Sequence, residues 1–276
     1  MTIQGHVIER LAEAAESVGS VRFGRSLLAL TRDLLPHDSY LTLKYFRHEA
    51  PKIDEEGGLA DGLMQFYASG VYKDDPFYKV WINHASYGVL ALARIEPNQD
   101  HPYFNLYLRP RAGITDEVGI LLPSVGDSVL GVFVEKKKNS YKEREISRLA
   151  RLYPLIFSLN RSHLNQLISR MRSIAEREFQ GAGKSLLILD RQGKAIAADA
   201  LWSDPNCDCP AFQALREMRS SNRASILLDD GRLLRRIKIV DDCGLGGALE
   251  AYCIEPRETA SRQKTALTDS SELWSK

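Results

Sequence analysis

The chain has 276 residues, of which 44% are hydrophobic and 26% are charged, a composition that supports more than one folded domain and excludes disorder as the main state. Its 37 Lys and Arg residues balance 36 Asp and Glu residues, so the overall charge predicts no attraction to nucleic acid or to an anionic membrane. The longest apolar runs, such as 88–93, fall short of the roughly 20 residues of a membrane-spanning helix, and residues 1–6 show no secretory signal. We therefore expect a cytoplasmic protein with no membrane association.

The first part of the chain predicts two helices and then a strand. Apolar residues at spacings of three and four predict helices near 5–18 and at 23–34, and Pro36 ends the second. Residues 40–46 are rich in aromatic and β-favouring side chains and predict a strand. The polar residues 48–58 predict a loop after it.

Helical spacing returns over 59–67, and after a turn at Gly70 another short helix begins at Asp75. Asp is a favoured N-cap and proline, here Pro76, a favoured first helical residue, so this start is well defined. Gly126 and Asp127 indicate a hairpin turn. It joins the last two of three further predicted strands, at 87–93, 116–122 and 128–135.

A long helix is predicted over 142–176, because apolar residues repeat at spacings of three and four. Two interpretations remain open: the helix packs on the core of the first domain, or it leaves that domain and pairs with its twin in a homodimer. Asn160 on the apolar stripe favours the dimer, since a polar residue there can set the register of a coiled coil. Pro154 is expected to kink the helix.

A second, smaller unit follows a flexible break at 180–183. It contains, in order, a hairpin, a helix and three strands, at 185–190 with 194–198, at 210–220, and near 225–228, 232–240 and 248–254. This order indicates an α+β domain with helices beside an antiparallel sheet. The expected divisions are a first domain, a linker helix, a second domain and a flexible tail, at 1–163, 164–180, 181–256 and 257–276.

Three segments resemble the sensor domains of LuxR-type transcription regulators. Residues 63–81 read LMQFYASGVYKDDPFYKVW and are similar to the family's tyrosine-rich helix, turn and Asp-Pro segment. Residues 113–119, GITDEVG, resemble the motif GLxDElG, and residues 141–163 resemble the helix FsxxELaxLraLaPlv…rrH. The resemblance spans residues 20–163 and implies a GAF-like domain, an antiparallel sheet with helices on both sides, that binds a small molecule.

The resemblance is incomplete in two places. Gly62 and Phe66 stand where acyl-homoserine-lactone receptors carry a Trp and a Tyr, which argues against a lactone ligand. The family's DNA-binding helix-turn-helix, which opens with LTxrE, is missing after Leu267, so the resemblance implies contact with DNA only through a missing domain or a partner protein. In the second unit, residues 187–193, LILDRQG, are similar to the opening hairpin of PAS-type domains; an unrelated α+β unit is the alternative.

The resemblance implies a ligand pocket between helices and sheet. The candidate ligand-binding residues are Tyr67, Tyr72, Asp75, Phe77, Tyr78 and Trp81. Aromatic side chains around one carboxylate suit a small organic ligand, with Asp75 accepting hydrogen bonds from it. In the structural alternative, Asp75 only caps its helix and the aromatic residues are core.

No catalytic residue, metal or cofactor is predicted. The six histidines are scattered and form no recognisable Ser-His-Asp or Cys-His arrangement. Cys207 and Cys209 have a Cys-x-Cys spacing that differs from zinc knuckles, and together with Cys243 and Cys253 they leave zinc binding, redox sensing and plain reduced thiols open. The main hypothesis is the ligand-sensing and dimerisation region of a LuxR-type regulator; the alternatives are a small enzyme or cofactor-binding protein on the same fold and a dimerisation scaffold.

Overall fold

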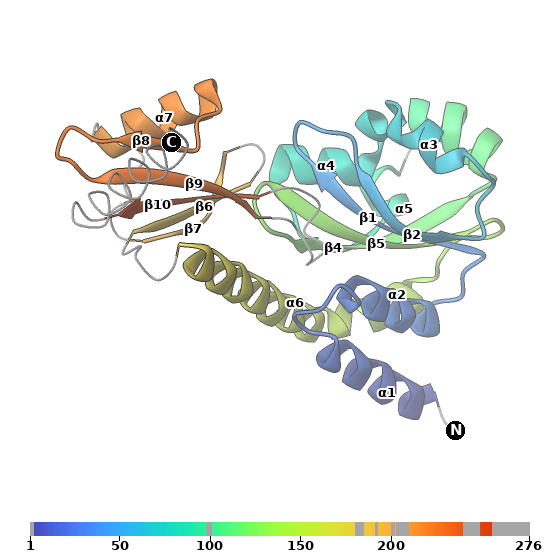
Figure 1. Cartoon of the computed structure of the whole chain (residues 1–276). Coiled ribbons are helices and arrows are strands. Elements are labelled where there is room, and N and C mark those ends of the chain that lie inside the picture. The colour runs from blue at the N-terminus through green and yellow to red at the C-terminus, as the bar shows by residue number, and fades with distance from the viewer. Residues whose placement is uncertain are drawn as a thin grey trace, which may run out of the picture. The chain divides into compact units, whose positions relative to one another are not determined.

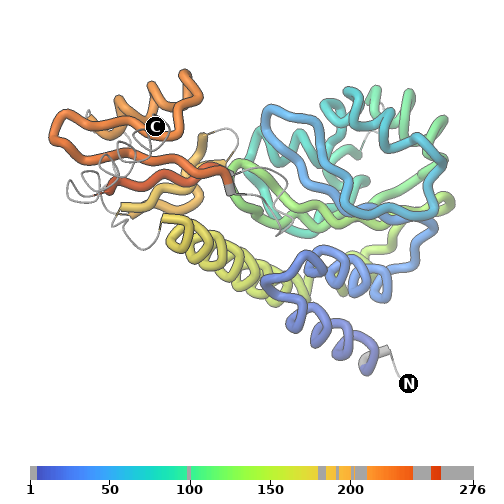
Figure 2. Tube along the Cα trace, viewed as in Figure 1, coloured from blue at the N-terminus to red at the C-terminus, as the bar shows by residue number. Residues whose placement is uncertain are grey.

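The computed structural model describes residues 3–97, 101–179, 185–190, 193–199, 202, 210–239 and 249–255. The chain divides into two compact units, Met1–Leu167 and Ile168–Lys276. Figure 1 shows the elements of each unit, and Figure 2 shows the path of the chain through them. The division falls inside one long helix, and the domain limits expected above stay predictions.

The first unit is built on a five-stranded antiparallel sheet. Its strands are β1 (Ser39–Phe46), β2 (Lys52–Gly57), β3 (Gly88–Ala91), β4 (Asp116–Pro123) and β5 (Ser128–Lys136). Their order is β2-β1-β5-β4-β3, and β4 and β5 form the predicted hairpin. Helices cover both faces of the sheet (Figure 1), which is why β4 and β5 are buried along almost their whole length.

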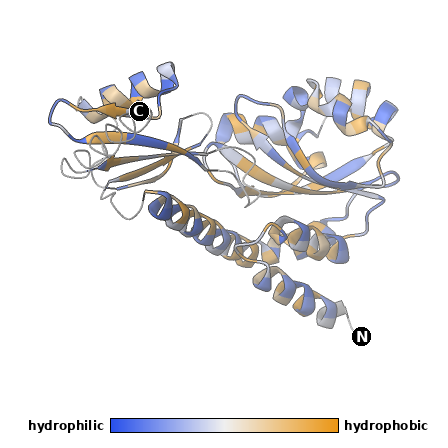
Figure 3. Cartoon of the chain, in the orientation of Figure 1, coloured by the Kyte–Doolittle hydropathy of each residue, from blue (hydrophilic) through white to orange (hydrophobic). Residues whose placement is uncertain are grey.

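Helices α1 (Ile3–Glu16), α2 (Phe23–Leu34) and the first part of α6 (Glu143–Glu178) pack on one face of this sheet. The core there joins α2, the strands and α6, through residues that include Phe23, Leu27, Val118, Ile120, Val132, Ile146, Leu149 and Ile156. The bounds predicted for α2 are confirmed. Apolar and polar residues alternate along α6 (Figure 3), as expected of a helix with one buried face.

The first turns of α6 pack on the core of the first unit, and pairing of α6 with a second copy stays a prediction. Asn160 is buried, and its Nδ2 donates a hydrogen bond of 2.8 Å to the carbonyl oxygen of Pro123 at the end of β4. This side chain is therefore engaged within its own chain, so it lends no support to a dimer register. Pro154 lies inside the helix, which continues through it without a break.

The other face of the sheet carries shorter helices. They are α3 (Leu63–Ala68), η1 (Val71–Asp74), α4 (Pro76–His84), α5 (Leu92–Ile95) and η2 (Tyr103–Ala112). Segment η2 is π-helical, and the sequence interpretation missed it because its turns do not repeat apolar residues at α-helical spacing. We call this face, with the residues packed on it, the aromatic side of the sheet.

The loop predicted at 48–58 was partly wrong, because residues 52–57 form strand β2 at the edge of the sheet. The strand was not predicted because most of its side chains are polar. Exposed and half-buried positions alternate along β2, and of its residues Ile53 packs against the core. An edge strand with charged residues facing water is a common way to keep a sheet from pairing with another chain.

The second unit contains another five-stranded antiparallel sheet. Its elements are β6 (Leu186–Leu189), β7 (Ala195–Ala198), α7 (Pro210–Ser221), β8 (Ser225–Leu227), β9 (Leu233–Ile239) and β10 (Leu249–Glu255), with the strands in the order β7-β6-β10-β9-β8. Numbered from the first strand of each unit, this is the same order, 2-1-5-4-3, as in the first unit. Helix α7 packs Ala211, Leu215 and Met218 on the sheet, which confirms the predicted α+β class.

Some predictions fall outside the described residues. These are the break at 180–183, the tail at 257–276, and Cys207, Cys209 and Cys243. Among the helices that are described, none combines the length and the apolar character that crossing a membrane requires.

Candidate ligand-binding site

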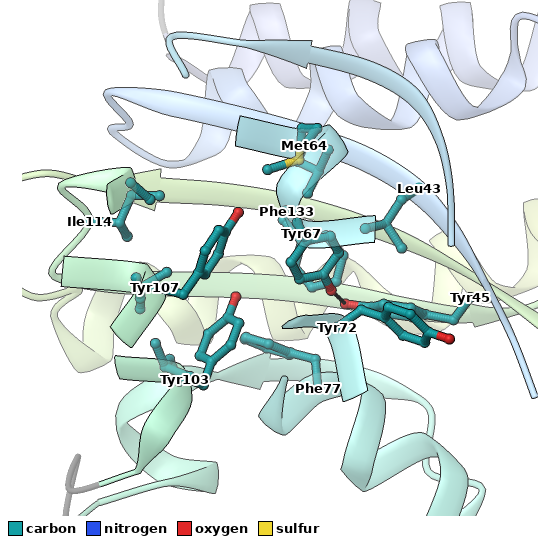
Figure 4. Close-up of a cluster of buried hydrophobic side chains, with 14 of the residues drawn as sticks. Leu43, Tyr45, Met64, Tyr67, Tyr72, Phe77, Tyr103, Tyr107, Ile114 and Phe133 are labelled. Carbon is teal, nitrogen blue, oxygen red and sulfur yellow. Dashed lines mark hydrogen bonds between the residues drawn. The ribbon is translucent and has the colours of Figure 1, made fainter. Parts of the chain in front are cut away.

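The aromatic side of the sheet in the first unit holds a cluster of buried rings. We call it the aromatic cluster; its members are Tyr45, Tyr67, Tyr72, Phe77, Trp81, Tyr103, Tyr107 and Phe133. They come from strands β1 and β5 and from α3, η1, α4 and η2, and Figure 4 shows most of them converging from these elements. Ring centroids of neighbours lie 5.1 to 6.5 Å apart, the spacing of favourable aromatic pairs.

Asp75 lies at the border of the aromatic cluster and fulfils the capping role predicted from the sequence. It is 2% exposed, and its Oδ1 accepts a hydrogen bond of 2.7 Å from the backbone N–H of Phe77. Its Oδ2 accepts hydrogen bonds from two tyrosine hydroxyls: that of Tyr45 at 2.6 Å and that of Tyr67. Both carboxylate oxygens are thus satisfied inside the chain.

Electrostatics around Asp75 are set by burial. Burial raises the pKa of the Asp75 carboxyl, and the hydrogen bonds from Tyr45, Tyr67 and the backbone work against that rise. Burial and the negative charge of Asp75 raise the pKa of both tyrosines well above the ordinary value. The two hydroxyls, which lie 3.1 Å apart and are joined by the dashed line in Figure 4, therefore stay protonated and act as donors.

The six residues predicted for the site lie together on the aromatic side. Phe77 is fully buried and meets Phe133 edge to face at 5.1 Å, and Trp81 stacks on Tyr45 at 6.4 Å. Tyr78 is only partly buried, and its hydroxyl donates to the backbone carbonyls of Phe46 and Arg47, next to the end of β1. Tyr67, Tyr72, Phe77 and Trp81 are all buried in the core of the aromatic side, as the structural alternative expects.

Two further tyrosines were missed because η2 was not predicted. Tyr103 and Tyr107 are buried, with ring centroids 5.5 Å apart, and Tyr107 lies 5.6 Å from Tyr67. Figure 4 shows their hydroxyls pointing the same way. Both rings belong to the buried core on the aromatic side of the sheet.

A row of polar side chains crosses three neighbouring strands on the same side. Ser39 of β1 is the register partner of Glu135 of β5, and Glu135 is the partner of Glu117 of β4. Alternation along the strands places the row on the side of Phe133 and Leu121. Both glutamates are 3% exposed. Ser39 Oγ donates to Glu135 Oε2 at 2.5 Å, whereas Glu117 Oε2 has no hydrogen-bond partner within the described part of the chain.

Burial and mutual repulsion dominate the two glutamates. Burial first, then the charges of Glu135 and Asp75, raise the pKa of Glu117 well above its ordinary value. Burial raises the pKa of Glu135 to about 7, and the hydrogen bond from Ser39 partly opposes the rise. The signal in the sequence was a pair of charged residues at one end of each of two otherwise apolar strands, Asp116 and Glu117 in β4 and Glu135 and Lys136 in β5. The motif GITDEVG includes Glu117, but the sequence interpretation assigned it no role.

Of the four cysteines, Cys253 is the one that lies among the described residues. Cys253 of β10 is a free, fully buried thiol, and burial raises its pKa to about 11. A thiol in this state is a poor nucleophile and a poor metal ligand. Within the described residues, no three His, Cys, Asp or Glu side chains gather in a way that could hold a metal ion.

The fold defines a mixed α+β protein with two antiparallel five-stranded sheets in the described residues. No protein-family model matches the chain, and no curated protein matches it by sequence. Among solved structures, the chain is similar to the VqsR LBD domain from Pseudomonas aeruginosa, with 26% identity and a TM-score of 0.50 over 59% of this chain and 98% of that one.

Two more distant structures are also similar. One is CepR2 from Burkholderia cenocepacia, described as an N-acylhomoserine-lactone-dependent LuxR-family transcription factor, with 11% identity and a TM-score of 0.43 over 62% of this chain and 99% of that one. The other is a GAF domain/HD domain protein from Geobacter sulfurreducens, with 12% identity and a TM-score of 0.37 over 62% and 99%. Of the three, VqsR has the highest identity and TM-score, and the proposal below rests on it.

Proposed function

We propose that this chain is the ligand-sensing and dimerisation region of a LuxR-type transcriptional regulator that acts in the cytoplasm and is not an enzyme. The similarity to the VqsR ligand-binding domain over 98% of that domain carries the proposal. Supporting it, the buried aromatic cluster lies on the same side of the sheet as Glu117, whose Oε2 has no hydrogen-bond partner among the described residues. Aromatic surfaces with a few polar groups suit a small organic ligand. DNA would be reached through another domain or a partner protein.

In this proposal the ligand binds on the aromatic side of the first unit. Tyr67 and Tyr72 supply ring faces, and Asp75 holds the hydroxyls of Tyr45 and Tyr67 in place. Phe77, Tyr78 and Trp81 support these groups from α4. These three residues of α4 therefore act through packing rather than through direct hydrogen bonds to the ligand.

Strand β4 and helix α6 supply a route from the ligand to the rest of the chain. The carbonyl oxygens of Leu121 and Pro123 in β4 accept hydrogen bonds from Tyr153 and Asn160 of α6. Helix α6 is continuous from Glu143 to Glu178 and so belongs to both units. A ligand that prefers one position of β4 over another would bias α6 by the same free energy.

The first test is native mass spectrometry of the full chain purified from its host, followed by denaturing analysis of what is released. We expect a bound small molecule and a mass of two copies of the 31.0 kDa chain. A dimer would use the outer face of α6, where Leu155 is 45% exposed. An empty protein under native conditions contradicts the sensor proposal, and a monomer contradicts the dimer.

The matched variants are Asp75→Asn and Asp74→Asn. Asparagine at position 75 keeps an oxygen for the N–H of Phe77 but replaces the carboxylate that accepts from two tyrosines, and hydrogen bonds to a charged group contribute about 1.5–3 kcal/mol. Asp74 is exposed and forms an ion pair with Lys79. We expect Asp75→Asn to lose the bound molecule and Asp74→Asn to keep it. Equal occupancy in both variants would leave Asp75 as a helix cap alone.

A further inference from the structure

Glu117 and Glu135 are difficult to explain as structural residues. They are directly opposite each other on adjacent antiparallel strands, where like charges destabilise a sheet. Both are almost completely buried, and a buried polar atom without a partner, such as Oε2 of Glu117, costs about 1–3 kcal/mol, more when it is charged.

In the part of the chain that the structure describes, no basic side chain forms an ion pair with Glu117 or Glu135. Among the described residues, Asp75 forms no ion pair either. Lys137, the basic residue whose charge acts on Glu135, is exposed and its Nζ donates to the carbonyl oxygen of Gly58 at 2.8 Å. The aromatic side therefore holds three buried carboxyl groups, and a positive charge from outside would favour their ionised forms.

The surrounding rings favour the same kind of group. The charges of Glu117 and Asp75 both act on Tyr103 and on Tyr107, so the two tyrosines lie within electrostatic range of the carboxyl groups. Tyrosine ring faces attract cations, with a contribution of about 2 kcal/mol or more when the cation is desolvated.

We propose that Glu117 and Glu135 form an amine subsite, in which the unpaired Oε2 of Glu117 accepts a hydrogen bond from a protonated amine of the ligand. Tyr103 and Tyr107 present their rings or hydroxyls to the same amine, and the aromatic cluster contacts its organic body. A bare metal ion fits less well, because a hard divalent cation takes about six oxygen ligands. The inference rests on the proposed ligand-binding function and assigns the chemical class of the ligand: small organic cations.

The test uses two pairs of probes that match in shape and differ in charge: phenethylamine with 2-phenylethanol, and putrescine with 1,4-butanediol. Binding to the full chain is measured by isothermal titration calorimetry at pH 7.5. We expect at least one amine to bind at least tenfold more tightly than its neutral partner. Equal binding of the pair members, or no binding of either amine, overturns the amine subsite.

Variants separate a ligand role from a structural one. Glu117→Gln should abolish the preference for the amine, because an amide carries no negative charge to pair with a protonated amine. It should not lower the melting temperature of the free protein, because Oε2 of Glu117 has no hydrogen-bond partner among the described residues to lose. The control Glu49→Gln changes an exposed glutamate between β1 and β2 and should alter neither. If Glu117→Gln lowers the melting temperature and leaves the amine preference intact, the residue is structural.

The failure of this inference can be told from failure of the proposed function. If native mass spectrometry releases a neutral or anionic molecule whose retention is unaffected by Glu117→Gln, the sensor function stands and the amine subsite is wrong. If no molecule is released and no probe binds, both are wrong.

Discussion

Replacing Glu135 by glutamine should change how the stability of the first unit depends on pH. Burial raises the pKa of Glu135 from 4.5 to about 7 in the folded chain. The folded state therefore holds a proton that the unfolded state has lost between these two pH values, and the contribution of Glu135 to stability falls as pH rises through this window. At 1.36 kcal/mol for each pKa unit, the full difference is on the order of 3 kcal/mol.

Wild-type stability alone would not reveal this effect. His163 is half-buried, stacks on Phe23 and accepts a hydrogen bond from the backbone N–H of Gly19, and burial lowers its pKa from 6.5 to about 4. It favours the folded state less as pH falls from 6.5 to 4, which is the opposite trend and of similar size. The quantity to measure is therefore the difference between wild type and Glu135→Gln.

The assay is urea unfolding at pH 5 and pH 8, followed by fluorescence of Trp81 in a background where Trp202 and Trp274 are replaced by Phe. The free energy of unfolding of wild type minus that of Glu135→Gln should increase by about 2–3 kcal/mol from pH 8 to pH 5. The free energy of unfolding of wild type minus that of the exposed-site control Glu49→Gln should be the same at pH 5 and pH 8. A difference between wild type and Glu135→Gln that is independent of pH would refute the assignment of a raised pKa to Glu135.

Two further predictions concern packing. Gly119→Ala places a methyl group 2.4 Å from Cε1 of Phe133, and overpacking of this kind costs about 1–3 kcal/mol of stability. Urea unfolding measures this loss, and an unchanged midpoint would mean that the Phe133 ring moves freely. Cys253 is fully buried and its pKa is raised to about 11, so its thiol should react with iodoacetamide at pH 8 far more slowly than in 6 M guanidinium. Peptide mass spectrometry follows the reaction, and equal rates would show that β10 opens readily.

The sequence was sufficient where one physical signal dominated. Helix α2 and the hairpin of β4 and β5 were predicted because apolar periodicity and a Gly-Asp turn act locally. Strand β2 was missed because its position at the edge of the sheet, which makes a polar strand stable, is a tertiary property. Likewise the stripe on α6 fits a core or a dimer equally well until the chain's own sheet is seen to bury it.

The candidate site was predictable in part. The six residues near Asp75 lie close together in sequence, so a local motif was enough to select them. Tyr45, Tyr103 and Tyr107 come from other elements, and Glu117 meets Glu135 only through the register of two strands. Local sequence patterns show that charged residues occur in an apolar strand. They do not show that Oε2 of Glu117 lacks a hydrogen-bond partner, because that depends on the side chains packed around it.

The strand order of the first unit also affects how the chain folds during synthesis. The central pair β1 and β5 joins residues as far apart as Ser39 and Glu135, which are 96 positions apart. Closing a loop of this length costs chain entropy before the contacts between β1 and β5 can form, and this cost slows folding. The nascent chain therefore carries β1 and β2 without their main partner until β5 leaves the ribosome, and a fragment that ends before residue 128 should depend on chaperones to avoid aggregation.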